Sequence, residues 1–122
     1  MGTGTGVVTP DSAAVSAFPA LQRLIDLRDG GGWLWLPTVV DGRMVEIHGV
    51  RTWPQGWADA LRVRSATDAA ALRNDHTGGI VWQRDGGLMD VVDALVALPA
   101  PGDRLAPRLV IGRAPTLWTP GG

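Results

Sequence analysis

The 122-residue chain contains no cysteine, no lysine and no tyrosine, and only one phenylalanine. The absence of cysteine excludes disulfides, thiolate metal ligands and a cysteine nucleophile. No apolar run approaches the roughly 18 residues that a membrane-spanning helix needs, and no basic segment followed by an apolar one marks a secretion signal. The sequence therefore predicts a cytoplasmic protein, without a membrane partner, whose stability comes from packing.

Groups suited to catalysis are also scarce, because the chain has two histidines, one glutamate and none of the HExxH, P-loop or GxSxG motifs. Glu46 and His48 are spaced to share one face of a strand, where they could act as an acid/base pair or as ligands. His76, in a loop, could join them only through folding. The simpler interpretation is a polar strand face in water. We keep Glu46, His48 and His76 as an alternative ligand site, and expect no cofactor, no metal and no catalytic activity.

The charges are nearly balanced, with a net charge of −1, and 45% of the residues are apolar. This composition predicts one folded domain, and the lack of a basic excess argues against nucleic-acid binding. All eleven basic residues are arginine and eleven of the twelve acids are aspartate, which indicates a GC-rich bacterial genome. A nucleic-acid site would need several arginines on one face, drawn from Arg62, Arg64, Arg104, Arg108 and Arg113.

Hydrophobic periodicity and turn residues divide the chain into elements. The dipeptide Asp41-Gly42 between two strand-like segments predicts a β-hairpin, and Pro37 places the first of these strands at a sheet edge or a bulge. A leucine and valine stripe predicts a mostly buried helix at 88–98. The remaining expected elements are short helical segments at 11–17 and 19–28, a strand at 61–64, a helix from Ser65 or Thr67 to Arg73, and strands at 80–84 and 108–111.

These elements predict a single α+β domain at 12–113, between flexible tails at 1–11 and 114–122. We expect a mainly antiparallel sheet of four or five strands, with two or three helices packed on one face. A parallel pairing of 80–84 with 108–111 is a further expectation, because a helix separates the two strands.

Tryptophan is the one residue in excess, with six copies. The tryptophans could fill a core that is short of other aromatics, or some could be exposed anchors, since tryptophan and arginine are enriched at interface hot spots. On the second interpretation, the candidate binding residues are Trp33, Trp35, Trp53, Trp57, Arg62 and Arg64. The resulting hypothesis is a small regulatory, adaptor or immunity-type interaction module that binds a protein partner or a second copy of itself. A small-ligand-binding protein or minor enzyme is the alternative.

Overall fold

The computed structural model describes residues 10–26 and 32–113. The expected tail at 114–122 and the last residues of the helix expected at 19–28 lie outside this range, as do residues 1–9 of the expected N-terminal tail. Within it the helical elements are α1 (Pro10–Ala17), the 3-10 turn η1 (Pro19–Leu21), α2 (Gln22–Ile25), the turn η2 (Pro54–Gly56) and α3 (Leu88–Ala97). The strands are β1 (Leu34–Val40), β2 (Arg43–Thr52), β3 (Ala58–Ser65), β4 (Asp68–Asn74), β5 (Gly79–Gly86) and β6 (Gly112–Arg113).

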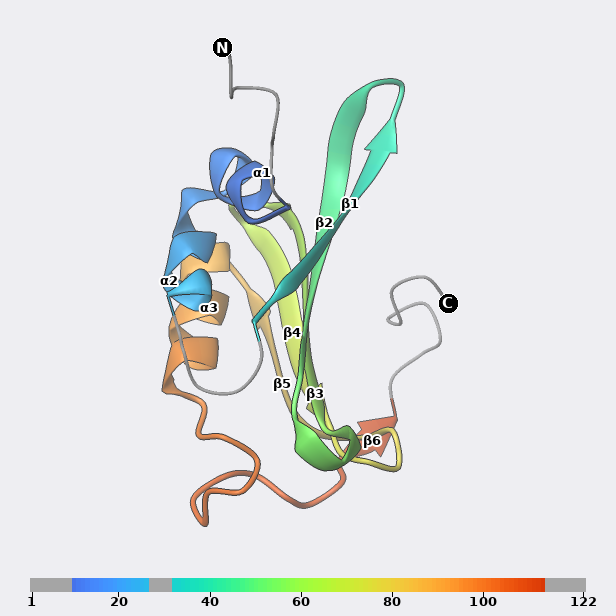
Figure 1. The fold of residues 1–122 in the computed structure, drawn as a ribbon, viewed down its shortest axis with the longest axis vertical. Coiled ribbons are helices and arrows are strands. Elements are labelled where there is room, and N and C mark those ends of the chain that lie inside the picture. Colours follow the sequence, from blue (N-terminus) through green and yellow to red (C-terminus); the bar gives the residue numbers. More distant parts are fainter. Residues whose placement is uncertain (1–9, 27–31, 114–122) are drawn as a thin grey trace.

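The strands form one antiparallel sheet in the order β1-β2-β3-β4-β5-β6, so each strand lies beside its neighbour in the sequence. Figure 1 shows α1, α2 and α3 together on the same side of this sheet. The predicted α+β class and the mainly antiparallel sheet are therefore confirmed. The sheet has six strands, however, rather than the expected four or five.

The predicted hairpin is formed by β1 and β2. Asp41 and Gly42 have φ angles of 52° and 76°, the left-handed pair that a tight hairpin turn requires. Pro37 lies on the edge strand β1, and the register shifts between Thr38 and Val39, so the edge and the bulge that proline predicted occur together. Figure 1 shows that the turn end of this hairpin extends beyond the helices.

The helix expected to end at Arg73 is wrong, because this segment is β4. Alanine, leucine and arginine favour a helix in isolation. Here all five residues from Ala69 to Arg73 are buried, between β3 on one side and β5 on the other. Burial and pairing on both edges outweigh the local preference, and the small alanines leave room for α3 against β4.

The strand expected at 108–111 is also wrong. This segment has no regular structure, and only the two residues of β6 pair with β5, in antiparallel orientation. The expected parallel pairing with 80–84 is therefore absent from the described sheet. Residues 108–111 instead lie along β5, where the amide of Ile111 donates to the carbonyl of Ile80 and Val110 packs on Gly79.

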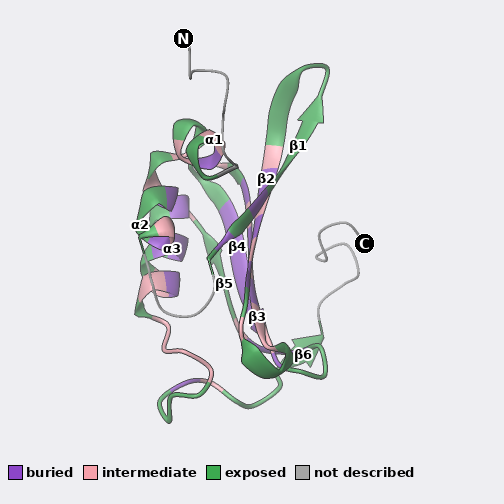
Figure 2. Ribbon diagram, viewed as in Figure 1, coloured by how far each residue is buried: buried purple, intermediate pink, exposed green. Residues whose placement is uncertain are grey.

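The core lies between the helices and the facing side of the sheet (Figure 2). The predicted stripe on α3 supplies its buried residues, and Leu21 and Leu24 enter from η1 and α2. The strands contribute Trp35, Ile47, Leu61, Val63, Ala69 and Ala71. Across the described residues, no helix is long and apolar enough to cross a membrane.

Candidate functional site

The structure divides the tryptophans into two groups. Trp33 and Trp35 are buried, and their rings stack with centroids 5.5 Å apart and planes at 16°. They belong to the core, which leaves them no surface for a partner. Trp53, Trp57 and Trp82 are only half-buried, whereas Trp118 lies outside the described residues.

Trp53 and Trp57 flank the corner that joins β2 to β3. The amide of Trp53 donates to the carbonyl of Trp57 at 2.8 Å and closes the corner, which contains a proline and a glycine, two residues typical of turns. Gln55 and Gly56 both have positive φ angles, 66° and 84°. That conformation is unusual for glutamine, and a Cβ on Gly56 would lie 3.4 Å from the backbone of His76.

A cavity of about 440 Å³ lies between this corner and the loop that follows α3, and we call it the corner pocket. The volume is within the range of ligand-binding cavities. Four of its lining residues are exposed, so the pocket opens at the surface. The lining residues are Trp53, Pro54, Gln55 and Trp57 from the corner, and Ala100, Pro101, Gly102 and Arg108 from the loop.

Behind Trp53 is a row of buried charges, formed by Arg51, Asp59 and Arg73 on neighbouring strands. Asp59 lies opposite Arg51 on β2 and opposite Arg73 on β4. Arg73 donates from Nε to Oδ1 of Asp59 at 2.6 Å and from a terminal nitrogen to Oδ2 at 3.1 Å, and Arg51 donates to Oδ2 at 3.0 Å. The three side chains are at most 3% exposed. This charge-row cluster is therefore a buried ion-pair network.

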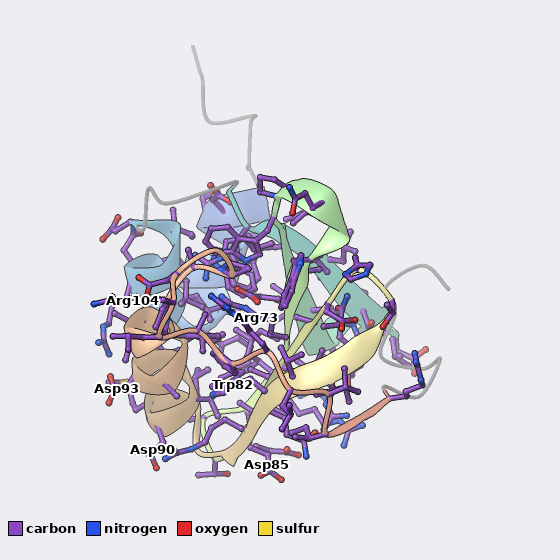
Figure 3. All side chains as sticks on the ribbon, turned by 90° about the horizontal axis from the view of Figure 1, so that it is seen from below. Arg73, Trp82, Asp85, Asp90, Asp93 and Arg104 are labelled. Atoms are coloured by element: carbon purple, nitrogen blue, oxygen red, sulfur yellow. The ribbon has the colours of Figure 1, made fainter. Side chains whose placement is uncertain are left out.

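The cluster makes hydrogen bonds toward both sides of the corner pocket. The indole Nε1 of Trp53 donates to Oδ2 of Asp59 at 2.9 Å, which sets the plane of its ring. Arg73 also donates to the carbonyl of Pro99, at the start of the loop that forms the opposite wall. Figure 3 shows Arg73 in the interior, with this loop crossing beneath it. A preorganised pocket is the result.

Cation–π contacts complete the cluster. The guanidinium carbon of Arg51 lies 5.1 Å from the ring centroid of Trp33 and 4.6 Å from that of Trp53, and that of Arg73 lies 5.5 Å from Trp53. Such contacts offset part of the cost of burying a cation. Nε of Arg51 is nevertheless buried without a hydrogen-bond partner among the described residues.

This cluster was not predicted from the sequence, although its signal is present there. In β2 the buried face reads Ile47, Gly49, Arg51, and in β3 it reads Asp59, Leu61, Val63. Every second residue of a strand points to the same face. A charged residue that takes its turn among the apolar ones is therefore buried with them and needs a partner of opposite charge. The sequence could have identified each charge as buried, but not their pairing.

The predicted residues Arg62 and Arg64 lie on the opposite face of β3 from Asp59. Arg62 is half-buried beside a second cavity of about 240 Å³, and Arg64 is exposed. Arg51 on the neighbouring strand β2 lies on the helix-covered face instead. The structure therefore does not bring the three cations together.

Glu46 and His48 do lie together on the sheet face opposite the helices, with Oε2 of Glu46 3.3 Å from Nε2 of His48. Arg64 donates to the other carboxylate oxygen at 2.8 Å, and this hydrogen bond raises the pKa of Arg64. His76 is elsewhere, beside Gly56 at the corner end of the sheet. The alternative ligand site is thus divided between two places.

No group of three or more histidine, aspartate or glutamate side chains in residues 10–26 and 32–113 is arranged to hold a metal ion. Comparison of the chain with protein-family models, with curated proteins and with solved structures found no match. The geometry of the corner pocket is therefore the basis for a functional proposal.

Proposed function

We propose that this chain is a non-catalytic protein-interaction module, in which the corner pocket receives a side chain of a partner protein. The supporting observation is a preformed cavity of about 440 Å³ walled by two half-buried tryptophans and rimmed by an exposed arginine. Tryptophan and arginine dominate binding hot spots, and a fixed wall lowers the entropy lost on binding.

The lining chemistry supports binding rather than catalysis. Among the described residues that line the pocket, Arg108 is the one charged side chain, and none is an acid, a histidine or a hydroxyl residue. A general base or nucleophile within reach of a bound group is the first requirement of most catalytic sites. The wall provides instead apolar surface and one hydrogen-bonding cation.

A site-specific cross-link tests this proposal. A photo-reactive residue placed at Gln55, on the exposed rim, should cross-link one partner protein in the producing cell. Trp57→Ala should abolish that product, because it removes one wall of the pocket. The same photo-reactive residue at Met89, exposed on α3, is the control. A product that forms equally from Met89, or that survives Trp57→Ala in folded protein, would contradict the proposal.

A second copy of the chain is the partner we propose for the β1–β2 hairpin. Near its turn the hairpin exposes four large apolar residues, Val39, Val40, Met44 and Val45, and no strand of the described residues lies on the outer edge of β1. Apolar clusters and bare edges favour association. Pro37 lacks an amide hydrogen, so it contributes no backbone donor to this edge. Light scattering on the wild type and on Val40→Asp tests for a dimer that the substitution dissociates.

A further inference from the structure

We propose that the partner segment bound by the corner pocket is acidic: a large apolar side chain enters the pocket, and a neighbouring carboxylate pairs with Arg108. This inference rests on the proposed function of the pocket and adds the chemistry of the partner. It follows from the charges around the pocket and from the character of its walls.

Arg108 is the group that meets the carboxylate. It lies on the pocket wall, is exposed, and within the described chain makes one long hydrogen bond, 3.4 Å, to the backbone carbonyl of Asp103. A guanidinium has five donors in a planar fork that matches a carboxylate. Most of that donor capacity therefore faces solvent, where a partner can reach it.

The charge-row cluster adds positive potential from behind the wall. Arg51 and Arg73 share the single carboxylate of Asp59, so two buried cations face one anion. The excess charge lies close to Trp53, whose ring centroid is 4.6 Å from Arg51 and 5.5 Å from Arg73. Buried charge is screened less than surface charge, so its field extends into the pocket.

The loop that forms the opposite wall contains one acid, Asp103, but this acid does not reverse the positive potential at the pocket. Its Oδ1 accepts a hydrogen bond from the amide of Leu105 at 2.8 Å, and the residue does not line the pocket. Arg104, next to it in the loop, carries the opposite charge. The wall and its surroundings thus keep a positive balance.

A cationic ligand is disfavoured by the same arrangement. An aromatic pocket can bind a cation over an indole face. Here the Trp53 ring already contacts two guanidinium groups, and Arg108 stands at the rim. A ligand cation added to these three would meet repulsion. The apolar walls of tryptophan, proline and alanine instead suit an uncharged anchor with its negative charge outside.

Three blocked tripeptides of equal size test the proposal: acetyl-Glu-Phe-Glu-amide, acetyl-Gln-Phe-Gln-amide and acetyl-Lys-Phe-Lys-amide. Their affinities are measured on the full chain through its tryptophan fluorescence, to which phenylalanine adds nothing, and through the indole resonances of Trp53 and Trp57. We expect the glutamate peptide to bind roughly tenfold more tightly than the glutamine peptide, and the lysine peptide most weakly. Added salt should reduce the difference.

Two variants locate the charge effect. Arg108→Gln should bring the glutamate and glutamine peptides within about twofold of each other, because it weakens binding of the glutamate peptide more than binding of the glutamine peptide. Arg104→Gln, an exposed arginine of the same loop that does not line the pocket, should leave most of the tenfold preference in place. An equal loss from both variants would assign the effect to general charge and overturn the role of Arg108.

The outcomes separate this inference from the proposed function. Equal binding of the three peptides at the indole resonances would overturn the acidic partner and leave the interaction pocket intact. Tighter binding of the lysine peptide, or no binding of any peptide, would likewise overturn the acidic partner. The cross-link from Gln55 decides the proposed function independently, because it requires no assumption about the charge of the partner.

Discussion

The indole nitrogen of Trp53 and the carboxylate of Asp59 are joined by a hydrogen bond of 2.9 Å, which links the pocket wall to the interior. The same carboxylate neutralises one of two buried guanidinium charges. A single aspartate therefore supports the fold and orients the pocket. Its removal should affect both.

Asp59→Asn should destabilise the protein by about 3–5 kcal/mol, because it leaves Arg51 and Arg73 buried without an anion. Urea denaturation measures the loss. Asp93→Asn is the matched control, since Asp93 forms a surface ion pair with Arg23 on α2. That exposed pair should contribute at most about 1 kcal/mol. Equal losses from the two variants would mean that Asp59 is not the anchor of the cluster.

Gly49→Ala should destabilise the sheet by about 1–3 kcal/mol through overpacking. Gly49 lies opposite Trp35, and a Cβ built on it would be 2.4 Å from the indole ring. Gly32→Ala, where a Cβ meets nothing within 4 Å, should be neutral. In the double variant Gly49→Ala/Trp35→Phe, the smaller ring should recover part of the loss. Strictly additive losses, measured by urea denaturation, would contradict the direct contact.

Asp75 should make stability depend on pH in the acid range. The hydroxyl of Thr77 and the amides of Thr77 and Gly79 donate to its carboxylate and lower its pKa in the folded state. Above the unfolded value of about 3.9, the ionised carboxylate contributes its full stabilisation. This contribution is lost as the pH falls through the lower, folded pKa.

Melting temperatures across the acid range should therefore show Asp75→Asn well below the wild type at neutral pH and closer to it at the lowest pH. Thr77→Val keeps the charge but removes the hydroxyl donor, so it should reduce the same pH dependence without abolishing it. A constant difference between Asp75→Asn and the wild type at every pH would show that the charge is not involved.

Acrylamide quenching should distinguish the two groups of tryptophans. In a Trp118→Phe background, Trp57→Phe should remove accessible fluorescence, because Trp57 is half-buried at the pocket. Trp33→Phe should remove only protected fluorescence, since Trp33 is 7% exposed. If the quenchable fraction does not change on Trp57→Phe, the corner pocket is closed in solution.

Local chemistry determined those parts of the fold that a few neighbouring residues can specify. Asp41 and Gly42 accept the left-handed angles of a hairpin turn, Pro37 cannot donate within a central strand, and the stripe on α3 has one apolar face. The alternation of Leu61 and Val63 with two arginines placed each side chain on its correct face. In these cases the interaction that decides the structure spans only a few positions of the chain.

Tertiary structure decided the rest. Residues 69–73 have the local preferences of a helix. They form a strand because β3 and β5 pair with both of its edges and α3 covers one face. The corner pocket needs a loop almost fifty residues from its tryptophans. The sequence shows three charges in apolar surroundings, but only the register of three strands puts Arg51, Asp59 and Arg73 in one row. Pairing energy between distant segments has no local signature, and this is why the sequence alone identified the corner tryptophans but not the cluster that holds them.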